Sequence, residues 1–378
     1  MELKKDWEIK KLKDICDKGS SNVNMKDLSN LEGNYPIYGA SGLIQNVNFY
    51  HQDKEYIGII KDGSGIGRTM LLPAKSSVIG TLQYILPKEG NSIHFINYAL
   101  QSLDLTKYKQ GAAIPHIYFR DYGETELVVP PLEEQKRIVK ILDEKFAQLE
   151  TIKINAQTNL HNAKDLFQSQ LTKAFSNTTW EKKRLGDCGT FKNGMNFAAT
   201  DSGYTIRSLG VGDFKDRYSI DNTETLSEIS LKAAPSEDYL LHDGDIVFVR
   251  SNGNKELVGR CLLVYPKNVL TTYSGFCIRF RKEFDLLDAD FLLHFMKAES
   301  SRKILNGKEG ANISNLNQKI LGDFEVPLPP LPEQKRIVKE LDSLSEKVRQ
   351  LQEIYTKQIA NCDELKQSLL QKAFEGEL

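Results

Sequence analysis

The amino-acid sequence predicts an α+β protein in which two mixed α and β domains alternate with two long helices. Three observations carry this prediction. One heptapeptide occurs twice, each copy opens a long stripe of apolar residues at helical spacing, and the segments between the stripes hold short β-rich runs separated by glycines. The prediction includes an approximate two-fold internal repeat, with the two helices paired as an antiparallel coiled coil.

Length and composition agree with two or three globular domains. The chain has 378 residues, of which 40% are hydrophobic and 27% charged, and its net charge is −1. This balance does not favour a strongly basic nucleic-acid-binding protein. Because the sequence has no apolar run of about 18 residues, we expect a soluble, cytoplasmic protein with no membrane contact. The five cysteines are scattered singly, which predicts neither a disulfide framework nor a cysteine zinc site.

Residues 1–130 are the first predicted domain. Its β-rich runs include Tyr56–Ile60 and Thr69–Leu72, and a helical pattern covers Ile93–Leu103. The loop between the two runs, Lys61–Arg68, superficially resembles a phosphate-binding loop, but an arginine replaces the lysine and no helical pattern follows. Three interpretations stay open for this loop: a turn between strands, a loop that contacts a nucleic-acid backbone, and a nucleotide site.

Residues 131–175 are the first predicted helix. It follows Pro130-Pro131, and Glu133 and Glu134 in its first turn favour the positive end of the helix dipole. Its apolar stripe consists of Val139, Leu142, Phe146, Leu149, Ile152, Ala156, Leu160, Ala163, Phe167, Leu171 and Ala174. At about 1.5 Å per residue the helix spans roughly 66 Å, too long for the surface of a small domain, so we expect its stripe to pack against a second helix.

Residues 176–329 are the second predicted domain, with β-rich runs at Asp245–Val249 and Gly259–Val264 and a helical pattern at Ala289–Ile304. A polar loop, Arg250–Lys255, again follows a strand and again leads to a Gly-Arg pair. This recurrence favours the binding interpretation of both loops. Basic side chains that could form one face of this domain are Arg207, Lys215, Arg217, Arg250, Lys255 and Arg260.

Residues 330–378 are the second predicted helix. The string EQKRIVK occupies Glu134–Lys140 and recurs, identically, 199 residues later at Glu333–Lys339. Its stripe consists of Val338, Leu341, Leu344, Val348, Leu351, Tyr355, Ile359, Cys362, Leu365, Leu369 and Ala373. If the halves are related by a two-fold axis, the second helix runs antiparallel to the first and the domains lie at opposite ends of a rod.

Motifs for catalysis are missing from the sequence. The six histidines form no metal-binding pair on a helix, no serine lies in a nucleophile elbow, and no N-P-P-[YF] string occurs. We therefore expect a chain that is not itself an enzyme and binds no metal.

Two unlike domains, each followed by nearly the same P-P-L-x-E-Q-K-R-I-V-K helix, closely resemble the DNA-specificity subunit of type I restriction-modification systems. The segment Tyr35–Gly42 looks like the Y-P-[VI]-Y-G stretch of many first recognition domains, and Gly244–Ser251 looks like the G-D-[IV]-[LV]-x-x-R-S strand and loop of such domains. The resemblance implies that each domain reads one half of a split, asymmetric double-stranded DNA target, while the helices set the number of unread base pairs.

The resemblance also implies partners. The chain would hold two modification subunits, which are methyltransferases, and through them the restriction subunits that cut DNA. S-adenosylmethionine, ATP and magnesium would then lie on these partners, with no cofactor on this chain. The rival hypothesis is a coiled-coil assembly scaffold that does not read sequence.

Individual contact residues follow as expectations. Arginine and asparagine suit base edges, whereas loop serine and lysine suit phosphates. For DNA contact we expect Tyr38, Ser41, Lys61, Ser64, Arg68, Gln83 and Gln110 in the first domain, and Arg207, Arg250, Ser251, Asn252, Lys255, Tyr273 and Asn312 in the second. Ile138, Ile141, Phe175 and Ile337 lie off or at the edge of the stripes, so we expect them to contact partner subunits or, alternatively, the chain's own domains.

Overall fold

The computed structural model describes residues 6–29, 31–198, 200–214, 217–305 and 315–378. The chain divides into two compact units: unit 1 comprises Met1–Gln157 and Tyr355–Leu378, and unit 2 comprises Thr158–Ile354. Two long helices, α4 (Leu132–Ala174) and α8 (Leu331–Phe374), each contribute one segment to each unit. Each unit therefore holds one sheet-containing domain and one end of both helices.

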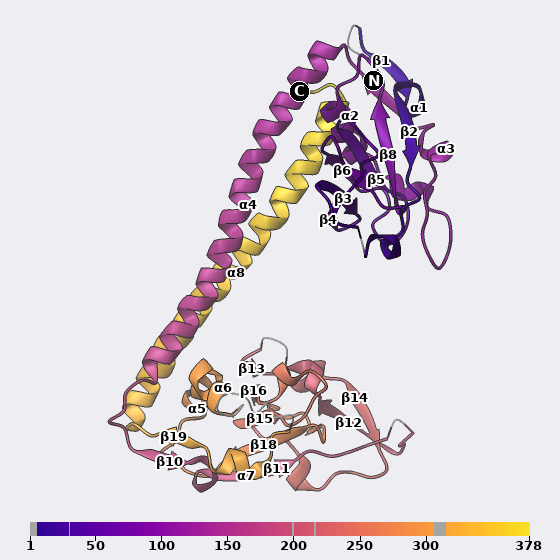
Figure 1. Cartoon of the computed structure of the whole chain (residues 1–378). Helices are drawn as coiled ribbons and strands as arrows, with labels where there is room; N and C mark the ends of the chain where they lie inside the picture. Colours follow the sequence, from indigo (N-terminus) through magenta and orange to yellow (C-terminus); the bar gives the residue numbers. More distant parts are fainter. Residues whose placement is uncertain (1–5, 30, 199, 215–216, 306–314) are drawn as a thin grey trace. The chain divides into compact units, whose positions relative to one another are not determined.

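Unit 1 is built on an antiparallel four-stranded sheet, beside which lie a three-stranded sheet and a two-stranded pair (Figure 1). The four-stranded sheet has the order β2 (Cys16–Ser20), β8 (Leu82–Pro87), β5 (Tyr56–Ile60), β6 (Thr69–Leu72); the three-stranded sheet has the order β4 (Gly42–Val47), β3 (Tyr35–Gly39), β7 (Ser77–Val78); the pair is β1 (Glu8–Lys11) with β9 (Glu126–Val129). Its helices are α1 (Leu12–Ile15), α2 (Ile93–Ser102) and α3 (Phe119–Tyr122), with short 3-10 turns at Met25–Leu28 and Leu105–Tyr108. Every residue of β5 is buried, which explains its uninterrupted apolar sequence.

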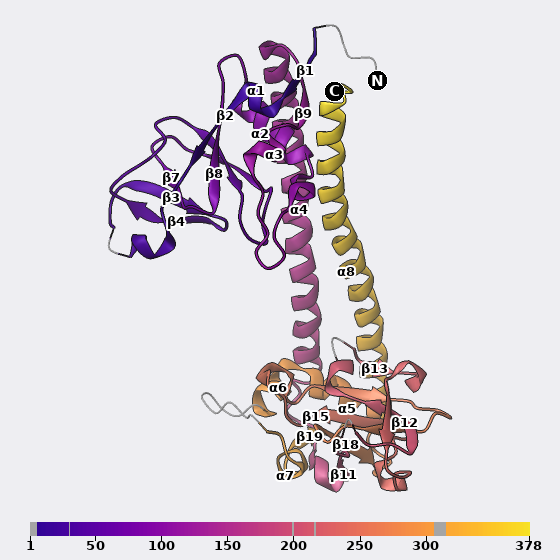
Figure 2. The same ribbon diagram turned by 90° about the vertical axis from the view of Figure 1, so that its right-hand side faces the viewer.

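Unit 2 repeats this plan with one more strand in the main sheet (Figure 2). The main sheet has the order β11 (Gly189–Asn193), β18 (Cys277–Lys282), β15 (Asp245–Val249), β16 (Cys261–Val264), β13 (Ser219–Ile220); the second has the order β14 (Glu228–Leu231), β12 (Tyr204–Leu209), β17 (Thr271–Tyr273); the pair is β10 (Lys182–Arg184) with β19 (Glu325–Pro327). Its helices are α5 (Ala289–Lys297), α6 (Glu299–Leu305) and α7 (Gln318–Gly322), with 3-10 turns at Leu185–Asp187, Val211–Asp213, Thr223–Thr225, Glu237–Tyr239 and Lys255–Leu257. The order β11, β18, β15, β16 therefore matches β2, β8, β5, β6.

Within unit 1 the ends of α4 and α8 pair in antiparallel fashion. Arg137 on α4 donates a hydrogen bond to the backbone oxygen of Leu378, and Lys153 forms an ion pair with Asp363 of α8 at 2.6 Å. Partner numbers fall along α8 as they rise along α4, as an antiparallel arrangement requires. In unit 2, Phe167 of α4 and Leu341 of α8 belong to the same apolar core. The predicted fold class is confirmed, while the exact domain limits at residues 130, 175 and 329 stay predictions.

The predicted seam is wrong at particular positions. Ile152 and Leu365 are 40% and 52% exposed, whereas Leu370, outside the predicted stripe, is fully buried. An α-helix has 3.6 residues per turn, so a stripe of strict three- and four-residue steps drifts around a long helix and leaves the contact face.

The repeated heptapeptide fastens each long helix to its own domain. Gln135 and Gln334 are buried, and each donates from Nε2 to the backbone oxygen of a preceding proline, Pro130 at 2.9 Å and Pro329 at 2.8 Å. The Oε1 atom of Gln135 accepts from the backbone N–H of Ser92, and that of Gln334 accepts from Asp288, both at 2.8 Å. Ser92 and Asp288 are the N-caps of α2 and α5. In each unit one glutamine side chain therefore connects the long helix, the proline turn before it and a helix of the domain.

Two residues expected to contact partner subunits are instead internal. Ile138 is 1% exposed in the core of unit 1, and Ile337 is 3% exposed in the core of unit 2, so both predictions of partner contact are wrong. Their burial confirms the alternative for both residues, which is packing onto the chain's own domains. Each of them lies one helical turn after the anchored glutamine. Phe175 likewise packs with Phe291 and Phe295, with ring centroids 5.3 Å apart in both pairs. Ile141 is half-buried, and partner contact there stays a prediction.

No helix in the part of the chain that the structure describes is long and apolar enough to cross a membrane. Among the same residues, no group of three or more histidine, cysteine or acidic side chains is placed to hold a metal ion. All five cysteines are free and buried.

Candidate functional site

Equivalent loops leave the central strand of each main sheet. In unit 1 the loop follows Ile60, whose backbone N–H donates to the oxygen of Arg68 at 3.0 Å; in unit 2 it follows Val249, which donates to Arg260 at 2.8 Å. A glycine precedes the arginine in both loops and donates back to the strand end at 2.9 Å. Gly67 and Gly259 have φ values of +83° and +79°, a conformation that glycine adopts without steric cost. The two loops, which were predicted to be similar, therefore share the same backbone hydrogen bonds and the same glycine conformation.

Two further segments hold the first residue of each loop in place. Lys61 donates its backbone N–H to Thr81 at 3.0 Å and accepts from Ile117 at 2.9 Å. Arg250 likewise donates to Phe276 at 2.8 Å and accepts from Leu316 at 2.8 Å. Three segments that are far apart in sequence thus meet at one edge of each main sheet, and we call these meeting points loop cluster 1 (residues 61–68, 79–81 and 110–118) and loop cluster 2 (residues 250–260, 274–276 and 315–316).

Loop cluster 1 contains a chain of charged and polar side chains. Lys61 donates to Asp62 at 2.9 Å, and the other carboxylate oxygen of Asp62 lies 2.7 Å from Nδ1 of His116. Gln110 exchanges two backbone hydrogen bonds of 2.8 Å with His116 and donates from its side chain to Asp121 at 2.8 Å. This network holds the side chains of loop cluster 1 in place. Asp62 also compensates the charge of Lys61 in the absence of a ligand.

The remaining polar groups of loop cluster 1 face solvent. Ser64 and Arg68 are exposed, and the only contact described for the Arg68 guanidinium, to the oxygen of Gly65, is long at 3.4 Å. Strand β6 follows the loop, so no helix N-terminus stands there to bind phosphates as in a P-loop. A P-loop arrangement is therefore wrong for this loop, and the turn and backbone-contact interpretations remain predictions.

Loop cluster 2 has the same frame and different side chains. Arg250 is half-buried, and the contact described for its guanidinium, with the oxygen of Gly275, is long at 3.4 Å. Oδ1 of Asn252 accepts from the backbone N–H of Asn254 at 2.8 Å, which closes a tight turn. Ser251 pairs with Asn315 through the backbone, and Lys255 at the loop tip is exposed.

The hairpin of β3 and β4 adjoins loop cluster 1. The backbone oxygen of Tyr38 accepts from Ile79 at 2.9 Å, two residues before Thr81, which binds Lys61. Tyr38 is half-buried, and Ser41 is exposed in the turn. Arg207, on β12, is occupied by the backbone oxygen of Leu226 at 2.7 Å and by Glu228 at 3.0 Å, so its charge is compensated within the domain.

Two predicted DNA contacts are wrong because the residues are internal. Gln83 is 5% exposed and accepts from the hydroxyl of Tyr122 at 2.6 Å. Tyr273 is fully buried and donates to the backbone oxygen of Lys192 at 3.3 Å, and burial raises the pKa of Tyr273 to about 12. Both lie on strands whose side chains enter the core, a direction that the sequence pattern did not reveal. Asn312, together with Lys215, lies outside the described residues.

Sequence reasoning missed several exposed groups in the loop clusters. Tyr118 is 43% exposed, its ring stacks on His116, and the guanidinium carbon of Arg120 lies 4.8 Å from its centroid. Phe276 is 60% exposed beside Arg250. The pair Gly111-Ala112 recurs 199 residues later as Gly310-Ala311 and marks the segment that holds His116 and Tyr118, whereas no sequence signal pointed to Phe276.

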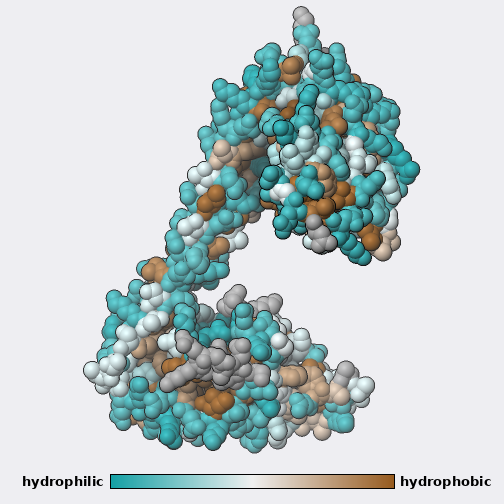
Figure 3. Space-filling view, viewed as in Figure 1, coloured by the Kyte–Doolittle hydropathy of each residue, from teal (hydrophilic) through white to brown (hydrophobic). Residues whose placement is uncertain are grey.

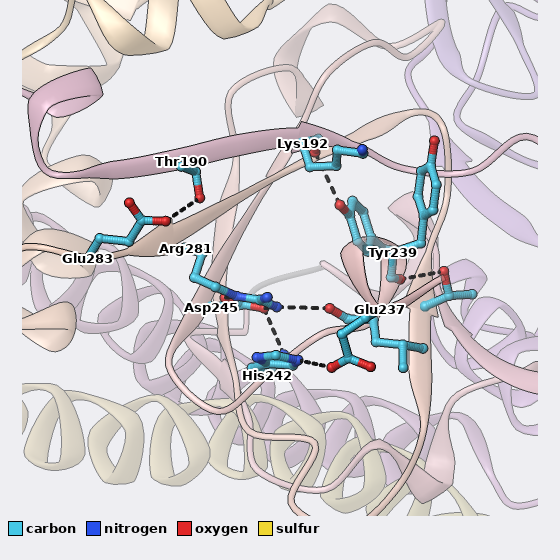
Figure 4. A network of polar contacts seen from close by, with 11 residues as sticks. Thr190, Lys192, Glu237, Tyr239, His242, Asp245, Arg281 and Glu283 are labelled. Carbon is cyan, nitrogen blue, oxygen red and sulfur yellow. Dashed lines mark hydrogen bonds and ion pairs between the residues drawn. The ribbon is translucent and has the colours of Figure 1, made fainter. Parts of the chain in front are cut away.

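The strand before loop cluster 2 is fixed by a buried ion pair (Figure 4). Asp245 is 1% exposed, receives hydrogen bonds of 2.9 and 2.8 Å from the guanidinium of Arg281, and also accepts from the backbone of His242 at 2.7 Å. Burial by itself lowers the pKa of Arg281, but the hydrogen bond and charge of Asp245 raise it overall. The Gly-Asp pair at 244–245 is thus structural, since Gly244 turns the chain at φ +87° and Asp245 holds the sheet.

Apart from these clusters, the view in Figure 3 shows a mostly hydrophilic face with apolar residues gathered in a few places. Charged pairs also cover the long helices, for example Arg336 with Glu333 and Glu340. Such exposed pairs contribute little to stability and keep the helices hydrated.

Comparison with known proteins gives consistent results. The family model for the type I restriction modification DNA specificity domain matches residues 4–160 and again 177–359. The specificity subunit of the type I restriction enzyme StySPI of Salmonella potsdam is 27% identical over 307 residues, which are 75% of this chain and 64% of that protein. The EcoKI specificity subunit of Escherichia coli K12 is 26% identical over 311 residues, 76% of this chain and 65% of that protein. The chain thus spans just under two thirds of the length of these two relatives.

A solved structure shows the same fold. A chain from a study of the structural basis of complex assembly and conformational transition of the type I R-M system aligns over 100% of both chains, with a TM-score of 0.78 and 19% sequence identity.

Proposed function

The chain belongs to the type I restriction-modification DNA-specificity family, and from this premise we propose that it reads a bipartite, asymmetric DNA target with one half-site per domain. One observation supports this most directly. The two loop clusters have the same backbone frame but unlike side chains: a paired Lys61 with Asp62 and His116 in one, and Arg250 with Asn252 and Phe276 in the other. Equal frames with unequal chemistry suit two different half-sites.

The chemistry of each cluster suggests how it binds. Arginine donates two parallel hydrogen bonds to the major-groove edge of guanine, and an exposed aromatic ring packs against a base or a thymine methyl group. Arg250 and Phe276 are therefore our candidates for base contacts in loop cluster 2, and Lys255 for a phosphate contact. In loop cluster 1, Arg68, Ser64 and Gln110 are the corresponding candidates, with Tyr38 and Ser41 on the adjoining hairpin.

Partner subunits complete the proposal. A net charge of −1 leaves little positive charge for holding a duplex, so other chains would supply most of the phosphate contacts. We assign this role to two modification subunits, methyltransferases that bind S-adenosylmethionine. These subunits would in turn hold restriction subunits that use ATP and magnesium. The chain described here would take no catalytic part.

Methylation mapping tests the proposal. Long-read sequencing detects methylated adenine across the genome of a host with this gene and of an otherwise identical host without it. We expect a split motif, two short defined parts separated by unread bases, to lose its methylation when the gene is removed. Unchanged methylation would reject sequence reading and favour the rival hypothesis of an assembly scaffold.

A further inference from the structure

His116 in loop cluster 1 is held by its backbone from two sides. It exchanges two backbone hydrogen bonds of 2.8 Å with Gln110. The next residue, Ile117, donates its backbone N–H to the oxygen of Lys61 at 2.9 Å. The frame of the cluster therefore fixes where this histidine stands on the domain, while its side chain stays 36% exposed.

Asp62 determines which ring nitrogen of His116 carries a proton. The Oδ1 atom of Asp62 lies 2.7 Å from Nδ1 of the ring. A carboxylate only accepts hydrogen bonds, so Nδ1 carries the proton and donates it. The other carboxylate oxygen accepts from Lys61 at 2.9 Å, and this ion pair already balances the charge of Asp62. The neutral ring therefore completes a group of three side chains without net charge.

Nε2 is the other nitrogen of the His116 ring. In the neutral ring it holds a lone pair, so it accepts a hydrogen bond and cannot donate one. Among the residues that the structure describes, the hydrogen-bond partner of the ring is at Nδ1 and none is at Nε2. The ring also stacks on Tyr118, with centroids 6.4 Å apart and planes at 25°. Loop cluster 1 thus presents a hydrogen-bond acceptor whose ring is oriented by its neighbours.

The same place in unit 2 is occupied by Asn315. It stands 199 positions after His116, the offset of the repeated heptapeptides. An isolated antiparallel backbone bridge joins Asp62 to His116 in unit 1, and the same kind of bridge joins Ser251 to Asn315 in unit 2. Asn315 is exposed, and asparagine offers one donor and one acceptor to an adenine edge. The repeated frame therefore presents a different polar side chain at this place in each unit.

We propose that Nε2 of His116 reads the exocyclic amine of adenine or cytosine in the major groove, with Asp62 as the positioning residue that selects the accepting tautomer. Adenine N6 and cytosine N4 are the amino donors that base edges display there. Guanine O6 and thymine O4 are acceptors, and they would face the lone pair of Nε2 without a hydrogen between them. His116 therefore rejects these two bases on the strand that it contacts. This assignment rests on the proposed function and adds a class of base to one half-site.

Nitrogen-15 NMR of the full chain labelled on histidine tests the tautomer in the absence of DNA. Spectra are recorded at about pH 8, above the range in which histidine usually titrates. The signals of His116 are those that disappear in His116→Ala, and the signals of the other histidines show that each variant is folded. We expect a protonated Nδ1 and an unprotonated Nε2 in the wild type. A wild-type ring protonated at Nε2, alone or together with Nδ1, would overturn the proposal.

Asp62→Asn tests the positioning role in the same spectra. The amide of asparagine can accept from Nδ1 or donate to it, so it no longer selects one tautomer. We expect the fraction of His116 protonated at Nε2 to rise in this variant. An unaltered tautomer would overturn the role of Asp62.

Methylation mapping tests the reading of the base. We expect His116→Ala to relax one position in the half-site that Arg250→Ala leaves unaltered, with discrimination there reduced about tenfold or more. Asp62→Asn should relax the same position toward bases with a carbonyl group, because its ring can also donate. The matched control is His161→Ala, which removes a histidine that lies 3.2 Å from Asp165 on α4, and it should leave the motif unaltered.

Failure of this proposal and failure of the proposed function give different results. If no methylated motif depends on the gene, the proposed function fails, while the NMR result on the tautomer stands. If a split motif depends on the gene but folded His116→Ala leaves it unaltered, the assignment of His116 is wrong. A uniform loss of methylation at all sites, with no relaxed position, would also overturn it, because a phosphate contact has that effect.

Discussion

Lys61 and Arg250 occupy the same backbone position in their domains but differ in how much of their binding capacity is already used. Lys61 is paired with Asp62 at 2.9 Å, whereas the contact that the described residues make with the guanidinium of Arg250 is long, at 3.4 Å. A ligand must compete with Asp62 for Lys61, whereas within the part of the chain that the structure describes most donors of Arg250 have no protein partner. Arg250 is therefore our first candidate for a base contact in loop cluster 2.

Replacing Arg250 by alanine should relax one position of one half-site. Loss of a bidentate base contact costs about 1–3 kcal/mol and removes discrimination at that base only. The measurement is the methylated motif in a host that carries the variant. Lys255→Ala is the control, since loss of a phosphate contact weakens binding to all sequences alike. Equal relaxation of both half-sites would contradict separate readers.

A second residue-scale prediction concerns the buried ion pair of Asp245 and Arg281. Asp245→Asn keeps the shape of the side chain but leaves the Arg281 charge without its partner, and we expect a loss of about 2–3 kcal/mol in the stability of unit 2. Urea unfolding monitored by circular dichroism measures it. Glu237→Gln, which breaks the exposed pair with His242 in the same network, should cost less than about 1 kcal/mol. Similar losses in both variants would refute a special role for Asp245.

At the scale of elements, the repeat preserves how each long helix joins its domain. Besides the two glutamines, Tyr98 of α2 donates to Asp143 of α4 at 2.5 Å, and His294 of α5 lies 2.8 Å from Asp342 of α8. Asp143 and Asp342 stand 199 positions apart, the same offset as the heptapeptides. Each long helix is therefore joined to its domain by equivalent side-chain hydrogen bonds as well as by apolar packing.

Gln135→Ala should loosen the junction of α2 and α4. It leaves the Ser92 N–H and the Pro130 oxygen without partners, at a cost of about 1–3 kcal/mol for each buried group. Amide hydrogen exchange at Ser92 should accelerate, while exchange at Asp288, held by the untouched Gln334, serves as the internal reference. Gln135→Glu retains the acceptor for Ser92 and should restore most of the protection. Unchanged exchange at Ser92 in the alanine variant would contradict the anchoring role.

How much the sequence predicts differs between elements. The prolines before each helix and the apolar residues at helical spacing predicted α4 and α8 closely, because both signals depend on neighbouring residues in the sequence. The main strands β5, β6, β15 and β16 were also predicted from apolar runs. The direction of Gln83 and Tyr273 was not, because a strand buried on both faces shows no alternation that would separate inward from outward side chains. His116 was missed because its role depends on a loop more than fifty residues earlier in the chain.

At the scale of the whole molecule, α4 and α8 are the only elements that contribute segments to both described units. If they set the number of unread base pairs, removing seven residues from each, 156–162 and 353–359, should shorten the spacer of the methylated motif. Seven residues correspond to about 10.5 Å of helix, or about 3 bp of DNA. The motif from methylation mapping is the measurement, and deletion in one helix alone is the control that should abolish activity. If a double-deletion variant still methylates DNA and its motif has an unaltered spacer, the helices do not set the number of unread base pairs.

Unit 1 is discontinuous in sequence, and this affects the order in which the molecule is completed during synthesis. Leu370 and Ala373, both fully buried in the core of unit 1, follow all of unit 2 in the sequence. Unit 2 is one continuous segment and is fully synthesised before them. The core of unit 1 therefore closes only after unit 2 has been synthesised, and a truncation just before Leu370 would damage unit 1 while leaving unit 2 whole.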